Sequence, residues 1–91
     1  MSSSQSSIHK LWTRCIFDTA SWRSRCPNRP SLYYTETGTL VLDARSMLPR
    51  DPELLNAIVF TCDIAAADYG FTQDLSVDDD NLFVWKKGGA A

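Results

Sequence analysis

The chain has 91 residues, a net charge of −2 and a hydrophobic share of 44% that includes three Trp, four Phe and three Tyr. These values fit one small domain with one core, which buries roughly 60–65% of the surface that the unfolded chain exposes. They exclude a chain that is disordered throughout. Apolar runs such as 57–60 are at most four residues long, far shorter than the ~20 residues that a membrane helix needs.

The N-terminus and the cysteines predict the compartment. Residues 1–7 lack the basic start and apolar run of a secretory signal. Cys15, Cys26 and Cys62 are odd in number and widely spaced, which does not suit a disulfide framework, although a single Cys15–Cys26 bridge stays open. We therefore expect a cytoplasmic protein with free thiols.

Charge is unevenly distributed along the chain. Residues 1–50 hold seven Lys and Arg against three Asp and Glu, whereas residues 51–91 hold two against eight. Such asymmetry predicts two electrostatic faces, which either meet head to tail or address different partners.

A first helix is expected over 8–22, after a structureless Ser-rich lead of residues 1–6 and with Ser7 as its cap. Its apolar residues recur every three or four positions and fall on one face. Phe17 is the exception, because it lies in the middle of the opposite, polar face. A proline-containing loop, 26–30, follows.

Three strands and a second helix complete the domain. Segments 31–35 and 40–43 are rich in β-formers, and Gly38 between them suits a tight hairpin. Segment 82–85 is the third expected strand. The order α-β-β-α-β predicts an α+β domain over 7–87, in which two helices pack on a three-stranded antiparallel sheet. The last residues, 88–91, read as a flexible tail.

The expected second helix has clear ends and two apolar sides. Asp51 can cap it, Pro52 suits its first position, and Gly70 ends it after Tyr69 as a left-handed cap. One broad apolar face suits the core, and a second stripe consists of Ala57, Phe60, Ile64 and Ala67. A helix that is apolar on two sides needs covering on two sides. The second cover comes either from the first helix or from another molecule.

No pattern of catalytic or metal-binding residues stands out. His9 is the only histidine, and its position relative to Cys15 on a helix is poor for activating a nucleophile. His9 and the three cysteines lack the closely spaced pairs of a zinc site, and the acidic run 78–80 lacks the spacing of a calcium loop. Phosphate-binding and dinucleotide motifs are absent. We expect a protein that is not an enzyme and holds no metal or cofactor.

Protein binding is the favoured function. Aromatic residues and arginine are the usual anchors of interfaces. The predicted interface residues are Phe17, Trp22, Ala57, Phe60 and Ile64. The alternative is that Phe17 packs under the proline loop while Phe60 and Ile64 pack on the first helix. The hypothesis is a regulator or inhibitor that masks a partner protein's surface, in the manner of an antiactivator or a phage-encoded inhibitor. A domain this small often associates with its own copies, so a homodimer is expected.

Nucleic-acid binding is the second hypothesis. Arg14, Arg23, Arg25 and Arg29 lie close together along the chain, and guanidinium groups suit phosphates. Against it, the whole chain is acidic and carries no recognised nucleic-acid-binding motif. These arginines would otherwise pair with the Asp-rich half of the chain.

Overall fold

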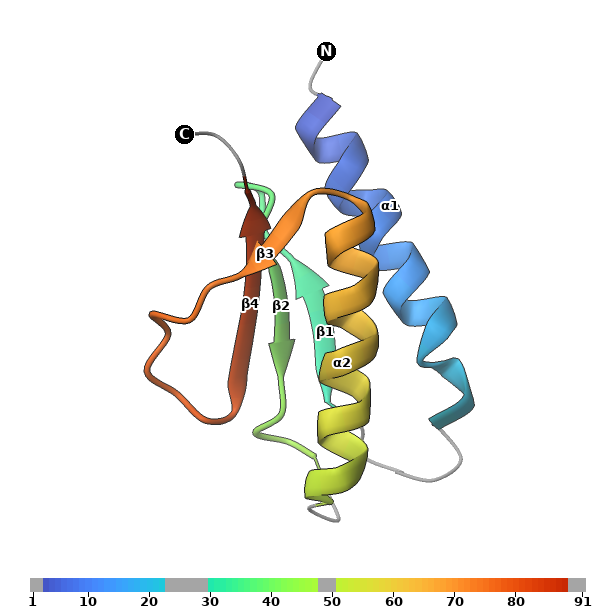
Figure 1. Cartoon of the computed structure of the whole chain (residues 1–91), viewed down its shortest axis with the longest axis vertical. Helices are drawn as coiled ribbons and strands as arrows, with labels where there is room; N and C mark the ends of the chain where they lie inside the picture. The colour runs from blue at the N-terminus through green and yellow to red at the C-terminus, as the bar shows by residue number, and fades with distance from the viewer. Residues whose placement is uncertain (1–2, 23–29, 48–50, 89–91) are drawn as a thin grey trace.

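In the part of the chain that the structure describes, two α-helices cover one face of a four-stranded antiparallel sheet (Figure 1). The computed structural model describes residues 3–22, 30–47 and 51–88, and for residues 3–6 and Trp22 it describes the backbone only. In chain order the elements are α1 (Ser3–Asp18), the 3₁₀ turn η1 (Ala20–Trp22), β1 (Ser31–Tyr34), β2 (Leu40–Asp43), α2 (Pro52–Asp68), β3 (Phe71–Gln73) and β4 (Leu82–Lys87). The predicted α+β class is confirmed.

The sheet has the order β1-β2-β4-β3, and each neighbouring pair is antiparallel. Between β1 and β2, Gly38 has a φ of 82°, the left-handed conformation that the expected hairpin requires. Leu40 lies opposite Trp85 and Leu42 opposite Phe83, and these four side chains face the helices. The central strands β2 and β4 therefore form the floor of the core.

The expected number of strands was wrong, because the described residues form four strands and not three. The additional strand is β3, which is only three residues long. Its sequence, Phe-Thr-Gln, is too short for an alternating pattern to be recognised. β3 exists because β4 runs on to Lys87, two residues beyond the expected end, and pairs with it: Phe71 lies opposite Lys87 and Gln73 opposite Trp85.

The ends of α2 agree with those predicted from the sequence. Asp51 has an extended backbone, and its Oδ1 accepts a 3.1 Å hydrogen bond from the amide of Leu54. Pro52 occupies the first helical position, where its missing N–H costs no hydrogen bond. At the other end Gly70 has a φ of 80°, which a residue with a Cβ rarely adopts.

The ends of α1 differ from those predicted from the sequence. The helix begins at Ser3, five residues before the expected start, so part of the expected structureless lead is helical. It ends at Asp18, and the expected last turn is the separate 3₁₀ segment η1. At this end the amide of Thr19 makes the last i→i−4 hydrogen bond, to the carbonyl of Cys15 at 3.0 Å, and its hydroxyl donates to the same carbonyl at 2.7 Å. The predicted proline loop lies mostly outside the described residues.

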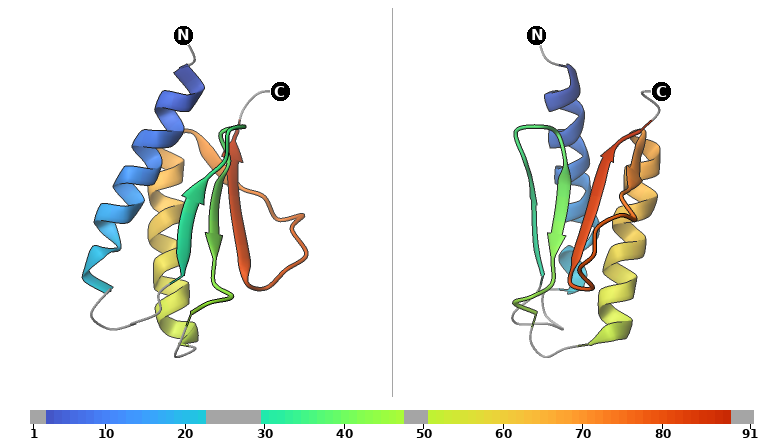
Figure 2. Two further views of the ribbon diagram at one scale, coloured as in Figure 1. Left: turned by 180° about the vertical axis from the view of Figure 1, so that it is seen from behind. Right: turned by 90° about the vertical axis from the view of Figure 1, so that its left-hand side faces the viewer.

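The core lies between the helices and the sheet (Figure 2). Trp85 is its largest fully buried side chain, and its indole Nε1 donates a 3.1 Å hydrogen bond to Asp63 Oδ1 on α2. Ile8 and Leu11 of α1 and Ile58 of α2 pack into the same cluster. Within the described residues, neither helix combines the length and the apolar content that crossing a membrane takes.

Candidate protein-interaction surface

The helices α1 and α2 lie side by side and run in opposite directions (Figures 1 and 2). On their inner side, the thiols of Cys15 and Cys62 are both buried in the core cluster. On their outer side, Arg14 Nη1 lies 2.7 Å from Asp68 Oδ2. These features fix the register between the helices.

Each helix carries an exposed phenylalanine two residues away from its core cysteine. Phe17 follows Cys15 by two residues, and Phe60 precedes Cys62 by two residues. The helices are antiparallel, so two residues forward along α1 and two residues backward along α2 lead in the same direction. Each of these steps covers about 3 Å along its helix axis. Phe17 is 80% exposed and Phe60 is 65% exposed.

Two further residues of α2 continue this patch. Ile64 is 48% exposed and lies one turn from both Phe60 and Asp68, on the side of α2 that borders α1. Ala57 is half-buried and lies one turn from Phe60 in the other direction. We call these four residues, Phe17, Ala57, Phe60 and Ile64, the outer helical surface.

The structure thus places four of the five predicted interface residues on one surface. In the described part of the chain, Phe17 and Phe60 remain mostly exposed and so do not serve as core residues. Trp22 ends η1, but its side chain lies outside the described residues. Sequence periodicity placed Phe17 on the polar face of α1. It could not show that this face borders the second apolar stripe of α2.

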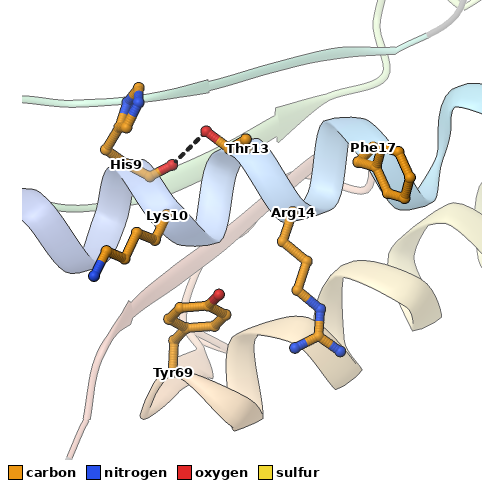
Figure 3. Close-up of a pocket in the computed structure, with 6 residues that line it drawn as sticks. All are labelled: His9, Lys10, Thr13, Arg14, Phe17 and Tyr69. Carbon is orange, nitrogen blue, oxygen red and sulfur yellow. Dashed lines mark hydrogen bonds between the residues drawn. The ribbon is translucent and has the colours of Figure 1, made fainter.

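A shallow groove extends the outer helical surface along α1 (Figure 3). Its volume is about 540 Å³, and it is lined by His9, Lys10, Thr13, Arg14, Phe17 and Tyr69. Figure 3 shows Arg14 and Tyr69 reaching into the space between the helices, with Phe17 at one end of the groove. The groove therefore combines cationic side chains with two aromatic rings.

The predicted arginine cluster is only partly described. Arg14 is engaged by two carboxylates, Asp68 at 2.7 Å and Asp18 at 3.4 Å, which compensate its charge. Arg23, Arg25 and Arg29 lie outside the described residues. Nothing in the described part of the chain gathers further arginines around Arg14, so a phosphate-binding cluster gains no support there.

Sequence reasoning missed an aromatic cluster between α1 and β1. His9 Nδ1 lies 3.0 Å from the hydroxyl of Tyr34, and the Trp12 ring meets Tyr34 edge to face with centroids 5.8 Å apart. The indole of Trp12 also donates a 2.9 Å hydrogen bond to the carbonyl of Leu32. These contacts join segments that are distant in sequence, so no local signal indicated them. They attach α1 to the edge strand β1.

The acidic turn between β3 and β4 is held by its own hydrogen bonds. Asp74 Oδ1 accepts from the amide and hydroxyl of Ser76, and Asp74 Oδ2 pairs with Lys86 at 3.0 Å. The Ser76 and Lys86 contacts lower the pKa of Asp74 to about 2. Leu75 in this turn is 85% exposed, and the turn projects on the opposite side of the sheet from α1 (Figures 1 and 2).

In comparisons with protein families, curated proteins and solved structures, nothing matches this chain.

Proposed function

We propose that this chain is a non-enzymatic protein-binding regulator that masks the surface of a partner protein with its outer helical surface. The observation that carries the proposal is the pair of exposed phenylalanines, Phe17 on α1 and Phe60 on α2, on two helices that pack against each other. Aromatic side chains in such positions supply much of the binding energy of known interfaces. Burying one of them stabilises a complex by ~2–3 kcal/mol.

The mechanism is steric. Both helices are anchored in the core, by Leu11 and Cys15 on one side and Ile58 and Cys62 on the other, so the surface is ordered before binding. A preordered surface loses little conformational entropy on association. The groove beside Phe17 then accepts a side chain of the partner protein.

The flanking charges direct the encounter. Lys10 borders the surface on α1 and Asp68 borders it on α2. Charges at the rim of an interface change the association rate more than the affinity. We place the protein in the cytoplasm, which suits the free thiols of Cys15 and Cys62.

The test is affinity capture from a nuclease-treated lysate with three forms of the chain. Wild type should retain a stoichiometric protein, and Phe60→Asp should lose it. Leu75→Asp is the matched control, because Leu75 is an exposed apolar residue on the acidic turn. If Phe60→Asp retains the same protein as wild type, the outer helical surface is not the binding site. If wild type captures partners from a parallel untreated lysate and none after nuclease treatment, the nucleic-acid hypothesis replaces the proposal.

A further inference from the structure

We propose that α1 covers the free edge of the sheet at β1, with Trp12 as the side chain that closes it, and thereby prevents β1 from pairing with β1 of a second copy of the chain. Two observations support this closure. One is the direction in which the backbone groups of β1 point, and the other is a hydrogen bond that Trp12 donates to them. The outer helical surface takes no part in the contact, so the proposal is independent of the proposed function.

The backbone groups of β1 point alternately toward β2 and away from it. In an antiparallel pair, residues that exchange hydrogen bonds alternate with residues that do not. The amide of Thr35 donates to the carbonyl of Thr39 on the far side of the hairpin, at 2.9 Å. Two positions back along the strand, Tyr33 therefore bonds to β2 in the same way. Leu32 and Tyr34 accordingly turn their N–H and C=O groups away from β2, and within the described residues β1 has no strand on that side.

Trp12 lies at this free edge. Its indole Nε1 donates a 2.9 Å hydrogen bond to the carbonyl of Leu32, which is one of the outward groups. The indole N–H thus stands where the N–H of an added strand would have to lie. Tyr34 packs edge to face on the Trp12 ring, with centroids 5.8 Å apart, and its hydroxyl lies 3.0 Å from His9 Nδ1. A further strand cannot pair with Leu32 while Trp12 remains in place.

β1 has a sequence that suits pairing with its own copy. It reads Ser-Leu-Tyr-Tyr, with two aromatic residues and no charged one. A free edge of this kind is a template for another chain unless charges, bulges or a covering element block it. About a two-fold axis at Tyr33, Leu32 of each copy lies opposite Tyr34 of the other. Each of these pairs can exchange both of its backbone hydrogen bonds, so the uncovered edge is self-complementary.

The other edge strand of the described sheet, β3, is limited in a different way. It is only three residues long, whereas β1 has four. Very short edge strands offer little to an incoming strand. The longer edge at β1 is therefore the one that needs a cover, and α1 packs against it.

Hydrogen exchange of the full chain, followed by NMR, tests the closure at single amides. In wild type the amides of Leu32 and Tyr34 should exchange quickly at every protein concentration, because no strand pairs with them. In Trp12→Ala the edge is open, so the protection of both amides should rise by at least about tenfold between micromolar and millimolar concentration. Trp12→Phe keeps a ring beside Tyr34 and removes the N–H donor, so it should show the same rise to a smaller extent.

Two further variants identify the cause of the rise. Tyr33 is 45% exposed, and in the paired form it lies opposite its counterpart in the other copy. Adding Tyr33→Lys to Trp12→Ala therefore places two cations opposite each other, and this double variant should lose the dependence on concentration. Phe17→Ala is the matched control, because it removes an exposed aromatic residue from the same helix, and it should behave as wild type.

Two results overturn the proposal. One is that the amides of Leu32 and Tyr34 stay unprotected in both Trp12 variants at millimolar concentration. The other is that their protection rises with concentration in wild type, because the edge is then not closed. Unfolding of Trp12→Ala would lower protection at all amides, which is the opposite of the expected change, and Trp12→Phe then decides.

Discussion

The thiol of Cys15 on α1 meets the thiol of Cys62 on α2 inside the core, and both side chains are fully buried. This contact sets the register of two antiparallel helices. The positions of Phe17 and Phe60 on the outer side follow from it. The packing of these two small core residues thus determines where the exposed aromatic residues lie.

The buried thiols should resist alkylation. Both side chains are fully buried, so the reagent does not reach them in the folded state. The contact with Cys15 and burial also raise the pKa of the Cys62 thiol, so its reactive thiolate is scarce. In a Cys26→Ser variant, which leaves only these two cysteines, a maleimide should react at least ~100-fold more slowly with the native protein than with the denatured protein. Mass spectrometry of quenched samples measures both rates. Equal rates would show that the helix contact opens freely.

Stability should depend on the core and not on the outer helical surface. Leu40 is completely buried between the sheet and the helices, so Leu40→Ala should lower the free energy of unfolding by about 2–5 kcal/mol. Phe60→Ala should change it by about 0.5 kcal/mol or less in the monomer. Urea unfolding at low protein concentration measures both. A large loss in Phe60→Ala would mean that Phe60 is part of the core.

The end of α2 should tolerate only certain residues at position 70. Gly70 has a φ of 80°, and a Cβ there would meet no neighbouring atom within 4 Å. The cost of Gly70→Ala is therefore the backbone strain alone, about 1–2 kcal/mol. Gly70→Asn should cost less, because Asn adopts this conformation more readily. Thermal unfolding compares the variants, and an unchanged midpoint in Gly70→Ala would contradict the left-handed cap.

Acid should weaken the β3–β4 turn through Asp74. Its pKa falls from the ordinary 3.8 to about 2, because Ser76 and Lys86 stabilise the charged form. A carboxylate whose pKa is lower in the folded state contributes its stabilisation above pH ~4 and loses it as the pH falls toward ~2. Asp74→Asn should therefore reduce the dependence of the thermal midpoint on pH in this range.

Part of that dependence should remain in the Asp74→Asn variant. Hydrogen bonds from Arg45 also lower the pKa of Asp43 to about 2, and this second carboxylate continues to titrate. The double variant with Asp43→Asn should flatten the profile further. A profile between pH 2 and 5 that is identical in wild type and Asp74→Asn would contradict the role assigned to the turn.

The sequence by itself determined the features that depend on neighbouring residues. Asp51 and Pro52 start α2, Gly70 ends it, and Gly38 forms the hairpin, because caps and turns depend on backbone angles and hydrogen bonds within a few residues. Periodicity likewise indicated the core face of each helix. It also singled out Phe17 as a residue on the wrong face.

Only the tertiary structure decided the features that join distant parts of the chain. The short strand β3 depends on the edge that β4 offers, and the pairing of Arg14 with Asp68 depends on how two distant helices pack. The placement of Phe17 and Phe60 on two neighbouring helices has the same origin. Contacts between residues far apart in the chain depend on the register between elements, and the core sets that register once the helices and strands have come together.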